Sequence, residues 1–391
     1  MGVGEIHPEM SLADHFAAFA GSSARDGAMT YAAICRFVAA DPELLAMMDE
    51  APASQQRPNL MLAAVHYLLL GGAAHPLATY YDTVAAYTGT EWVSPSVAEL
   101  EAVGPDFRDF CLTHAASLLD LIATCSTQTN EIGRCTALLP ALSHIASTYE
   151  GGQAIGLLDL GTSAGLNLFF DRYAYTYRER LDGAITGAQA EAGDHASAVQ
   201  LDCVYRGELA DLPSLELPAI AERAGLDLSP IDPHDEAGVR WLLACLWPDH
   251  LPRFARLRAA LDIARTEAHP PVLHIGDMVD HVGDVAATVA PGLPLVIFHS
   301  WVAAYLTEQR QRELSDTVRG LSDSSGRAVH YLYAESPEQT PGLPTPVSPH
   351  PDAHSNMATV LVHVSPDAAP IRLADMHHHG RSLRWWGAQP V

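Results

Sequence analysis

The sequence contains no lysine, so all 22 of its basic residues are arginine. Lysine Schiff-base catalysis and a Walker A phosphate-binding loop are therefore excluded, because both require a lysine amine. The six cysteines form no Cys-x-x-Cys pair, so neither a zinc knuckle nor a disulfide framework is indicated. No apolar run reaches the ~18 residues of a membrane span, and the first residues lack a signal-peptide pattern. We expect a cytoplasmic protein that does not bind membranes.

Positive charge is scarce as well. The formal net charge is −25 over 391 residues, and charged residues make up only 18% of the chain. A strongly acidic surface repels nucleic-acid phosphates, so nucleic acid is not an expected partner. The length allows one large or two medium domains with a sizeable core. A small-molecule substrate is the expectation that remains, and no pattern in the sequence predicts an oligomeric state.

The most informative segment is 157–168. Leu157–Leu160 predicts a buried strand, and Gly161 and Gly165 permit the positive φ angles of a tight turn. Ser163 is expected to cap a following helix, whose first amide groups would face a ligand. In open α/β sheets, ligands bind just beyond the carboxyl ends of strands. The predicted ligand-binding residues of this segment are Asp159, Gly161, Thr162, Ser163, Gly165 and Asn167.

Two functional interpretations of this turn compete with a third in which it binds no ligand. The spacing Asp159-x-Gly161-x-x-x-Gly165 is similar to the nucleotide turn of S-adenosylmethionine (SAM) methyltransferases. The overlapping spacing Gly161-x-Ser163-x-Gly165 matches the nucleophile elbow of α/β-hydrolases. A hydrolase elbow normally follows several strands, whereas no strand pattern precedes Leu157. The order of the elements therefore favours the nucleotide interpretation.

The periodicity predicts two domains. Residues 11–149 show helical spacing with hardly a β-branched run, which predicts an all-α domain over residues 1–150. Residues 151–391 are expected to form a Rossmann-like α/β domain, with a mainly parallel sheet covered by helices on both faces. A mostly helical insertion is expected at about 217–268. Further strands are predicted at 198–204, 271–276, 295–299, 328–334, 359–364 and within 371–386.

A polar phrase at 127–134 fits neither helix nor strand periodicity. One interpretation is a capped helix start with a local ion pair between Glu131 and Arg134. The other is that Asn130, Glu131 and Arg134 converge on the ligand of the glycine turn. His299, at the end of a predicted strand, is either a strand-end cap or a general base with a pKa near neutrality. The candidate catalytic residues are His299, Glu131, Asn130 and Arg134.

A histidine cluster lies near the carboxyl end, at Met376-His377-His378-His379. In an extended conformation His377 and His379 would share one face. Two imidazoles without a placed carboxylate make a poor metal site, so no metal is predicted. We expect surface histidines beside Trp385 and Trp386.

Four phrases together resemble a known bacterial family, domain of unknown function 2332, over most of the chain. They are Gln56-Arg57-Pro58-Asn59-Leu60, Thr129-Asn130-Glu131-Ile132-Gly133-Arg134, Gly161-x-Ser163-Ala164-Gly165-Leu166-Asn167 and His379-Gly380-Arg381. Members of this family resemble class I SAM methyltransferases in fold, so the resemblance implies SAM as the cofactor.

The resemblance also implies roles for individual residues. Asp277-Met278 is similar to the acidic motif that contacts adenine, and His299 stands where such enzymes place residues facing the methyl group. The carboxylate that would bind the ribose is either Asp202 or Glu208. Ser163 departs from the pattern, because it replaces the middle glycine of Gly-x-Gly-x-Gly.

Three functional hypotheses are compatible with these residues. The leading one is a SAM-dependent methyltransferase that acts on a small-molecule acceptor. The second is a serine hydrolase or acyltransferase with Ser163 as nucleophile, Asp277 as the acid and a later histidine such as His299 as the base. The third is a methyltransferase-like fold that binds a ligand or catalyses a reaction without SAM.

Overall fold

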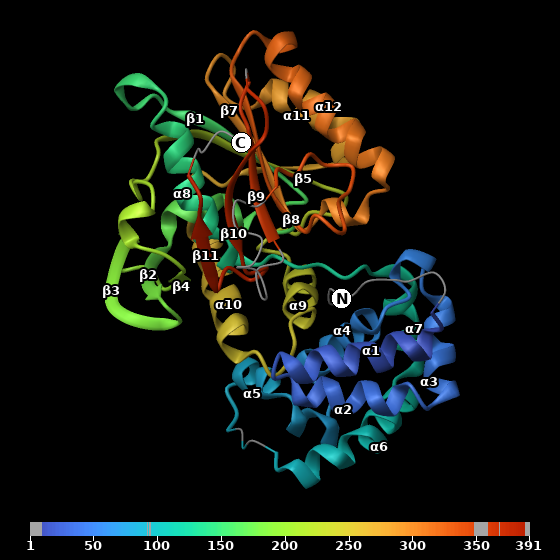
Figure 1. The fold of residues 1–391 in the computed structure, drawn as a ribbon. Coiled ribbons are helices and arrows are strands. Elements are labelled where there is room, and N and C mark those ends of the chain that lie inside the picture. Colours follow the sequence, from blue (N-terminus) through green and yellow to red (C-terminus); the bar gives the residue numbers. More distant parts are fainter. Residues whose placement is uncertain (1–9, 92, 94, 348–358, 367, 388–391) are drawn as a thin grey trace. The chain divides into compact units, whose positions relative to one another are not determined.

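The computed structural model describes residues 10–347, 359–366 and 368–387, except residues 92 and 94. The chain forms two compact units: unit 1 comprises Met1–Thr129 and His234–Arg258, and unit 2 comprises Asn130–Pro233 and Ala259–Val391. The boundary therefore lies after residue 129 rather than near residue 150. Residues 234–258 belong to unit 1 rather than to an insertion in the α/β domain. Figure 1 labels the elements of both units.

Unit 1 is built from helices. Its α-helices are α1 (Leu12–Arg25), α2 (Met29–Val38), α3 (Pro42–Ala46), α4 (Pro58–Leu70), α5 (Asp82–Thr88), α6 (Val97–Thr113), α7 (Ala115–Thr124) and α9 (Glu236–Ala244). Its 3₁₀ helices are η1 (Met47–Glu50), η2 (Ala53–Gln55) and η3 (Pro76–Tyr80). Helix α10 (Leu251–Thr266) begins in unit 1 and ends in unit 2.

Helix α4 explains why residues 234–258 join unit 1. Most of its side chains are buried, and His66 lies among them with 0% of its surface exposed. The Nδ1–H of His66 donates to the carbonyl of Ala244 at the end of α9 (3.1 Å), and its Nε2 accepts from the hydroxyl of Thr83 (2.8 Å). A buried imidazole needs both partners, so this contact ties α9 to α4.

Unit 2 contains an 11-stranded sheet among the residues that the structure describes. From one edge to the other its strands are β3 (Ala184–Gly193), β2 (Ala174–Leu181), β4 (Gln200–Tyr205), β11 (Ser382–Trp385), β10 (Ile371–Met376), β9 (Thr359–Val364), β8 (Val329–Glu335), β7 (Leu295–Ser300), β1 (Ile155–Leu160), β5 (Ile220–Asp227) and β6 (Val272–Ile275). The helices of this unit are α8 (Cys135–Ala146), α11 (Met278–Thr288), α12 (Glu308–Ser325) and the 3₁₀ helices η4 (Ile132–Arg134), η5 (Glu150–Gly152), η6 (Leu166–Arg172), η7 (Leu209–Asp211) and η8 (Ala303–Tyr305).

The sheet is mostly parallel. Strands β6, β5, β1, β7 and β8 run parallel to one another, as do β11, β4 and β2. The antiparallel pairs are β8–β9, β9–β10, β10–β11 and β2–β3. This arrangement confirms the predicted mixed α/β structure with a mostly parallel sheet and helices. Strand β1 is buried at every residue, as a central parallel strand requires.

One predicted element is wrong. Residues 220–227, inside the segment expected to be a helical insertion, form strand β5 beside β1. The strand predicted at 198–204 is present as β4. Its neighbours in the sheet are β2 and β11, so it does not lie next to β1. Strand β5 is hard to recognise because Glu222 and Arg223 are followed by Ala224 and Gly225, so it has no run of β-branched residues.

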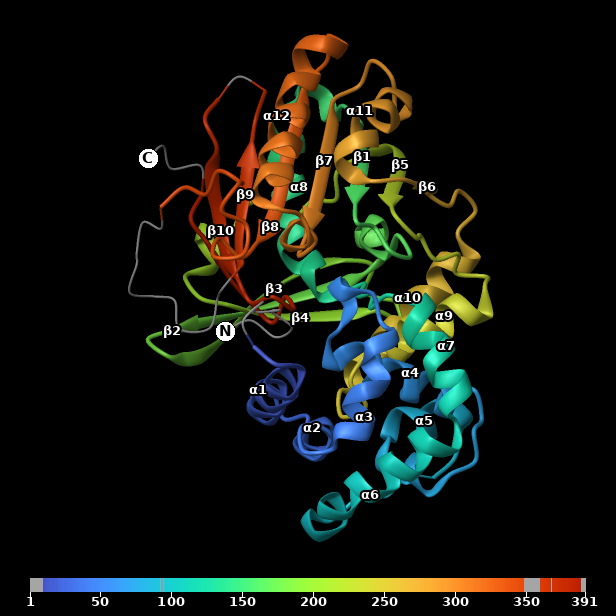
Figure 2. The same ribbon diagram turned by 90° about the vertical axis from the view of Figure 1, so that its right-hand side faces the viewer.

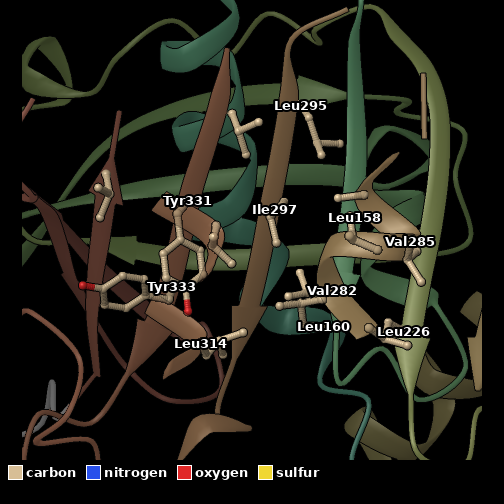
Figure 3. Packing of buried hydrophobic residues seen from close by; sticks show 14 of the residues in the cluster. Leu158, Leu160, Leu226, Val282, Val285, Leu295, Ile297, Leu314, Tyr331 and Tyr333 are labelled. Carbon is tan, nitrogen blue, oxygen red and sulfur yellow. The ribbon is translucent and has the colours of Figure 1, made fainter. Parts of the chain in front are cut away.

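Different helices pack against the two faces of the sheet. Leu158, Ile297 and Tyr331 point to one face, where they belong to one buried cluster with Val282 of α11 and Leu314 of α12 (Figure 3). Neighbouring residues along a strand point to opposite faces. The alternate residues, such as Phe298 and Leu332, therefore face the side on which α8 lies. Figure 2 shows α11 and α12 in front of β7 and β8, with α8 behind these strands.

Candidate active site

The turn after β1 contains three residues with left-handed backbone conformations: Gly161 (φ 69°), Ser163 (φ 54°) and Gly165 (φ 71°). This conformation is ordinary for glycine and uncommon for serine. The chain thus turns sharply at the carboxyl end of β1, where the sequence predicts a turn.

The segment after this turn is not an α-helix. It is the 3₁₀ helix η6, which follows Gly165 and has no side-chain cap, so the prediction that Ser163 caps a helix is wrong. Residues 166–170 are all buried, and the hydroxyl of Tyr173 donates to the carbonyl of Leu166 (2.6 Å). A surface α-helix has one solvated face, which this segment lacks. The turn that the structure describes therefore presents no α-helix N-terminus to an anion.

The chain itself fills the space around the turn. The exposed fractions of the predicted ligand residues are 3% for Asp159, 0% for Thr162, 4% for Ser163 and 7% for Asn167. A Cβ atom on Gly161 would overlap the side chain of Val302, and one on Gly225 would overlap that of Thr162. The glycines therefore allow segments of the chain to approach one another closely.

Asp159 is a buried carboxyl group in this turn. The hydroxyl of Thr162 donates to its Oδ2 (3.0 Å). Burial raises the pKa of Asp159 to about 8; the Thr162 hydrogen bond and Arg134 oppose this rise, whereas Asp227 adds to it. At neutral pH the protonated, uncharged form therefore predominates, since the low-polarity surroundings disfavour the carboxylate.

Asp227 ends β5 and binds the turn directly. Its Oδ2 accepts the backbone N–H of Ser163 (2.9 Å), and its Oδ1 accepts that of Ser229 (2.9 Å). Asp227 thus occupies the carboxyl end of the strand beside β1, the position expected for an acidic residue that binds a ribose. Asp227 could not be recognised from the sequence, because residues 217–268 are predicted to be mostly helical.

Asp202 and Glu208, the two carboxylates considered for the ribose, lie away from the strand next to β1. Asp202 is in β4, where it forms an exposed ion pair with Arg178 (2.8 Å). Glu208 precedes η7. Asp202 lies within the second predicted strand along the chain and Glu208 follows it, but the order of strands in the sequence is not their order in the sheet.

Asp277 follows β6 and begins α11. Its Oδ1 accepts the N–H of Val279 (2.8 Å) and pairs with Arg310 (2.7 Å), and Met278 packs against the core cluster of Figure 3. Because Asp227 pairs in register with Ile275, the ends of β5 and β6 lie side by side.

Two large aliphatic side chains are exposed at this edge of the sheet. Leu228 directly follows β5 and is 70% exposed, and Ile275 ends β6 and is 78% exposed. In the sequence, Leu228 directly follows Asp227, and Ile275 lies two residues before Asp277. The carboxyl ends of β5 and β6 therefore present apolar surface together with negative charge.

His299 is buried in a hydrogen-bonded network. Its Nδ1 lies 2.8 Å from Oε1 of Glu335, and its Nε2 lies 2.7 Å from the hydroxyl of Tyr331. The Nδ1–H therefore donates to the carboxylate, and Nε2 accepts from the tyrosine. With 1% of the residue exposed and both nitrogens engaged, the structure does not place His299 where a base could meet an acceptor.

Glu335 also holds the loop that follows β7. Its Oε1 accepts the N–H groups of Val302 (3.0 Å) and Ala303 (3.1 Å). Trp301 has φ 55°, an outlier for a bulky residue, and its indole N–H donates to the hydroxyl of Thr359 (2.8 Å). These bonds keep Val302 against Gly161.

Asn130, Glu131 and Arg134 are brought together with the turn. Oδ1 of Asn130 accepts the N–H of Leu166 (3.1 Å). Arg134 donates from Nε to the carbonyl of His378 (2.9 Å) and from Nη1 to the carbonyl of Ser300 (3.0 Å). These bonds join η4 to the ends of β1, β7 and β10. The phrase at 127–134 is therefore more than a local surface ion pair.

Glu131 pairs with His379, which belongs both to the histidine cluster near the carboxyl end and to one of the four family phrases. Its Oε2 lies 3.1 Å from Nδ1 of His379, and its Oε1 accepts the N–H of Gly133. Among the described residues, no three His, Cys, Asp or Glu side chains come together as metal ligands do.

A small cavity lies between α8 and the sheet. Its volume is about 20 Å³, enough for about one water molecule. Its walls are mainly apolar, with the polar side chains of Arg134, Asn167 and Ser300 among them. The lining residues are Arg134, Ala137, Leu138, Asn167, Phe298, His299, Ser300, Leu332, Ala334, Leu361 and Met376.

Comparison with known proteins identifies a family. A family model described as "Uncharacterized protein conserved in bacteria (DUF2332)" matches residues 13–385, so the chain belongs to this family. No curated protein and no solved structure matches the chain significantly. None of the described helices combines the length and apolar character that crossing a bilayer requires.

Proposed function

We propose that this member of the DUF2332 family is a SAM-dependent methyltransferase that acts on a small-molecule acceptor. The observation that carries the proposal is the change of direction at β1. After β1 the chain forms β2, β3 and β4 at the far end of the sheet, then β5 and β6 on one side of β1, and then β7 and β8 on the other. In open parallel sheets, ligands bind at the carboxyl ends of the strands at such a switch point. The glycine turn, Asp227 and Arg134 all lie at this edge.

The residues at the ends of β5 and β6 fit the adenosine part of SAM. Asp227 provides carboxylate oxygens for ribose hydroxyls, and the exposed side chains of Leu228 and Ile275 provide apolar surface for the base. In this proposal Asp277 and Met278 also face the cofactor, and Gly161 lets Val302 approach the turn closely. The buried residues Asp159, Thr162, Ser163, Gly165 and Asn167 shape the turn from within. When bound, the cofactor would supply an electrophilic methyl group.

The acceptor is proposed to bind near Arg134, because this arginine connects the ends of β7 and β10 and lines the cavity. A guanidinium favours an anionic or hydrogen-bonding acceptor. Methyl transfer depends mainly on in-line placement of the two reacting groups, so residues that hold the acceptor matter more than covalent catalysts. Asn130 and Glu131 hold η4 in place, and the Tyr331–His299–Glu335 network supports the loop beyond β7.

Calorimetry with SAM and S-adenosylhomocysteine tests this proposal. We expect wild-type protein to bind both, and Asp227→Asn to weaken binding by about 10- to 100-fold. This range corresponds to about 1.5–3 kcal/mol for a hydrogen bond to a charged group. Asp202→Asn is the matched control, because Asp202 lies in an exposed ion pair with Arg178. If folded wild-type protein gives no heat at millimolar ligand, the SAM proposal fails.

One observation favours the alternative of a serine hydrolase. Ser163 has the positive φ that a nucleophile elbow imposes on its serine. However, both nitrogens of His299 are engaged by Glu335 and Tyr331 rather than by Ser163. In the described part of the chain, no strand precedes β1. These two features favour the methyltransferase.

Ser163→Ala separates the two enzyme classes. If Ser163 only shapes the turn, we expect SAM affinity to fall by no more than about tenfold, which corresponds to about 1.4 kcal/mol. If Ser163 is a nucleophile, turnover of any ester substrate would fall by several orders of magnitude. We expect no labelling of wild-type protein by a fluorophosphonate probe, with a known serine hydrolase as positive control. Covalent labelling of Ser163 would favour the hydrolase.

A further inference from the structure

A chain of hydrogen bonds connects the end of α8 to the buried face of the sheet in unit 2. The hydroxyl of Tyr149, which follows α8, lies 2.6 Å from Nε2 of His330 in β8. Nδ1 of His330 lies 2.8 Å from Nε2 of His363 in β9. Both histidines are 5% exposed, and their rings are stacked with centroids 5.1 Å apart. Three segments of the chain are thus joined through one buried polar group.

The geometry of this chain fits two uncharged imidazoles. Two ring nitrogens 2.8 Å apart share a single proton, because one must donate and the other must accept. If Tyr149 donates to His330, then His330 donates to His363; the bonds can also run in the opposite direction. In either direction Nδ1 of His363 is buried and has no hydrogen-bond partner among the described residues. If both rings were charged, two N–H groups would face each other.

The surroundings of the two rings offer no negative charge among the described residues. Burial lowers the pKa of His330 to about 4 and that of His363 to about 3. A charge on the half-buried His144 of α8 lowers the pKa of both further. The residues in register with the two histidines on the adjoining strands are apolar: Val296, Leu332 and Ile371.

We propose that Tyr149, His330 and His363 form an acid-sensitive latch that holds the end of α8 against β8 and β9. When each imidazole binds a second proton, both rings become charged and the hydrogen bond between them breaks. A state in which the end of α8 has separated and water solvates the rings is then favoured. The latch also concerns the candidate active site, because α8 directly follows η4, in which Arg134 binds the ends of β7 and β10. The inference does not depend on the proposed reaction.

The direction of the pH effect follows from the lowered pKa values. A solvated histidine binds its proton at about pH 6.5, so between this pH and about pH 4 the open state binds more protons than the closed state. The latch therefore has its full stability above about pH 7 and loses it as the pH falls. Each histidine that binds a proton on opening raises the opening constant by up to about tenfold per pH unit. Two histidines raise it by up to about 100-fold per pH unit.

Hydrogen exchange of the full-length protein, read by mass spectrometry at pH 7 and pH 5, tests the latch. After correction for the intrinsic effect of pH on exchange, we expect the opening constant of peptides covering residues 140–150 and 359–364 to rise at least about tenfold at pH 5. A local readout is needed because burial also lowers the pKa of His66, in unit 1, to about 4. Loss of protection throughout unit 2 without earlier opening of these peptides would overturn the proposal.

A double variant and a matched control assign the effect to the two histidines. The variant His330→Gln/His363→Gln cannot become charged at these positions, so its peptides should open equally at pH 7 and pH 5. His269→Gln, which replaces an exposed histidine of the same unit, should behave as wild type does. If the double variant opened at pH 5 as much as wild type does, the latch would be wrong.

NMR titration of the histidine Cε1 protons tests the latch even if the double variant does not fold. With signals assigned from the two single variants, we expect His330 and His363 of folded wild-type protein to remain uncharged from pH 7.5 down to about pH 5. Protonation of both at about pH 6.5 in the folded protein would mean that closure does not oppose their charge, and it would overturn the proposal. Neither experiment requires SAM, so the latch and the proposed function can fail separately.

Discussion

Replacing Gly380 by alanine is expected to destabilise unit 2 by about 3 kcal/mol or more. Gly380 has φ 70°, a conformation that costs an L-residue roughly 1–2 kcal/mol. The added Cβ would also overlap the carbonyl of Gly133, which is backbone and cannot rotate away. Steric overlap of this kind in a packed region belongs to the mechanisms that give the largest effects of single substitutions.

Urea denaturation measures this effect, and Gly320→Ala is the matched control. Gly320 lies inside α12, and a Cβ there would meet nothing within 4 Å. Alanine at an open helical position should stabilise the protein by about 0.5–1 kcal/mol. If Gly380→Ala were as stable as wild type, the close approach of Gly133 and Gly380 would be wrong.

Asp159→Asn is expected to stabilise the protein at pH 8 and to have little effect near pH 4. Burial raises the folded-state pKa of Asp159 to about 8, from an ordinary value of 3.8. Between these values the folded protein binds the proton more tightly than the unfolded chain does, so stability falls as pH rises. The difference of about 4 pH units corresponds to at most about 6 kcal/mol. Asparagine is never charged, and its carbonyl oxygen can still accept from Thr162.

Chemical denaturation of both proteins at pH 5, 6, 7 and 8 tests the sign. The stability advantage of Asp159→Asn should grow at each step and level off above pH 8. Asp202→Asn should show no such trend, because Asp202 is exposed. If wild-type protein gained stability relative to Asp159→Asn as pH rose, Asp159 would be a carboxylate stabilised by its surroundings. The Asp159 carboxyl group would then not lie in surroundings of low polarity.

The strands could be predicted where they are buried on both faces. Residues 157–160, 295–299 and 328–334 are nearly continuous apolar runs, and each lies within a strand of the parallel part of the sheet. Strand β5 could not be predicted, since its sequence Ile-Ala-Glu-Arg-Ala-Gly-Leu-Asp has no such run. Its neighbours in the sheet bury Ala224 and Leu226, and neither residue is distinctive of a strand.

The candidate site, too, could be predicted only in part from the sequence. The polar phrase at 130–134 was recognised, because its residue types fit no periodic element. The partner of Glu131 could not be predicted, because His379 lies 248 residues away and no local pattern connects them. The sequence leaves His299, at the end of a predicted strand, as either a general base or a strand-end cap. The structure gives it two buried partners, Glu335 and Tyr331.

The sequence by itself determined the acidic, lysine-free composition, the apolar strands and the sharp turn at Gly161 to Gly165. Each of these depends on residue type or on spacing within a few residues. Only the tertiary structure decided that β5 rather than β4 lies beside β1, and that Asp227, rather than Asp202 or Glu208, ends the strand next to β1. Only the tertiary structure also joined Glu131 to His379. Strand order and such pairings depend on which distant surfaces bury one another, and local periodicity carries no information about this.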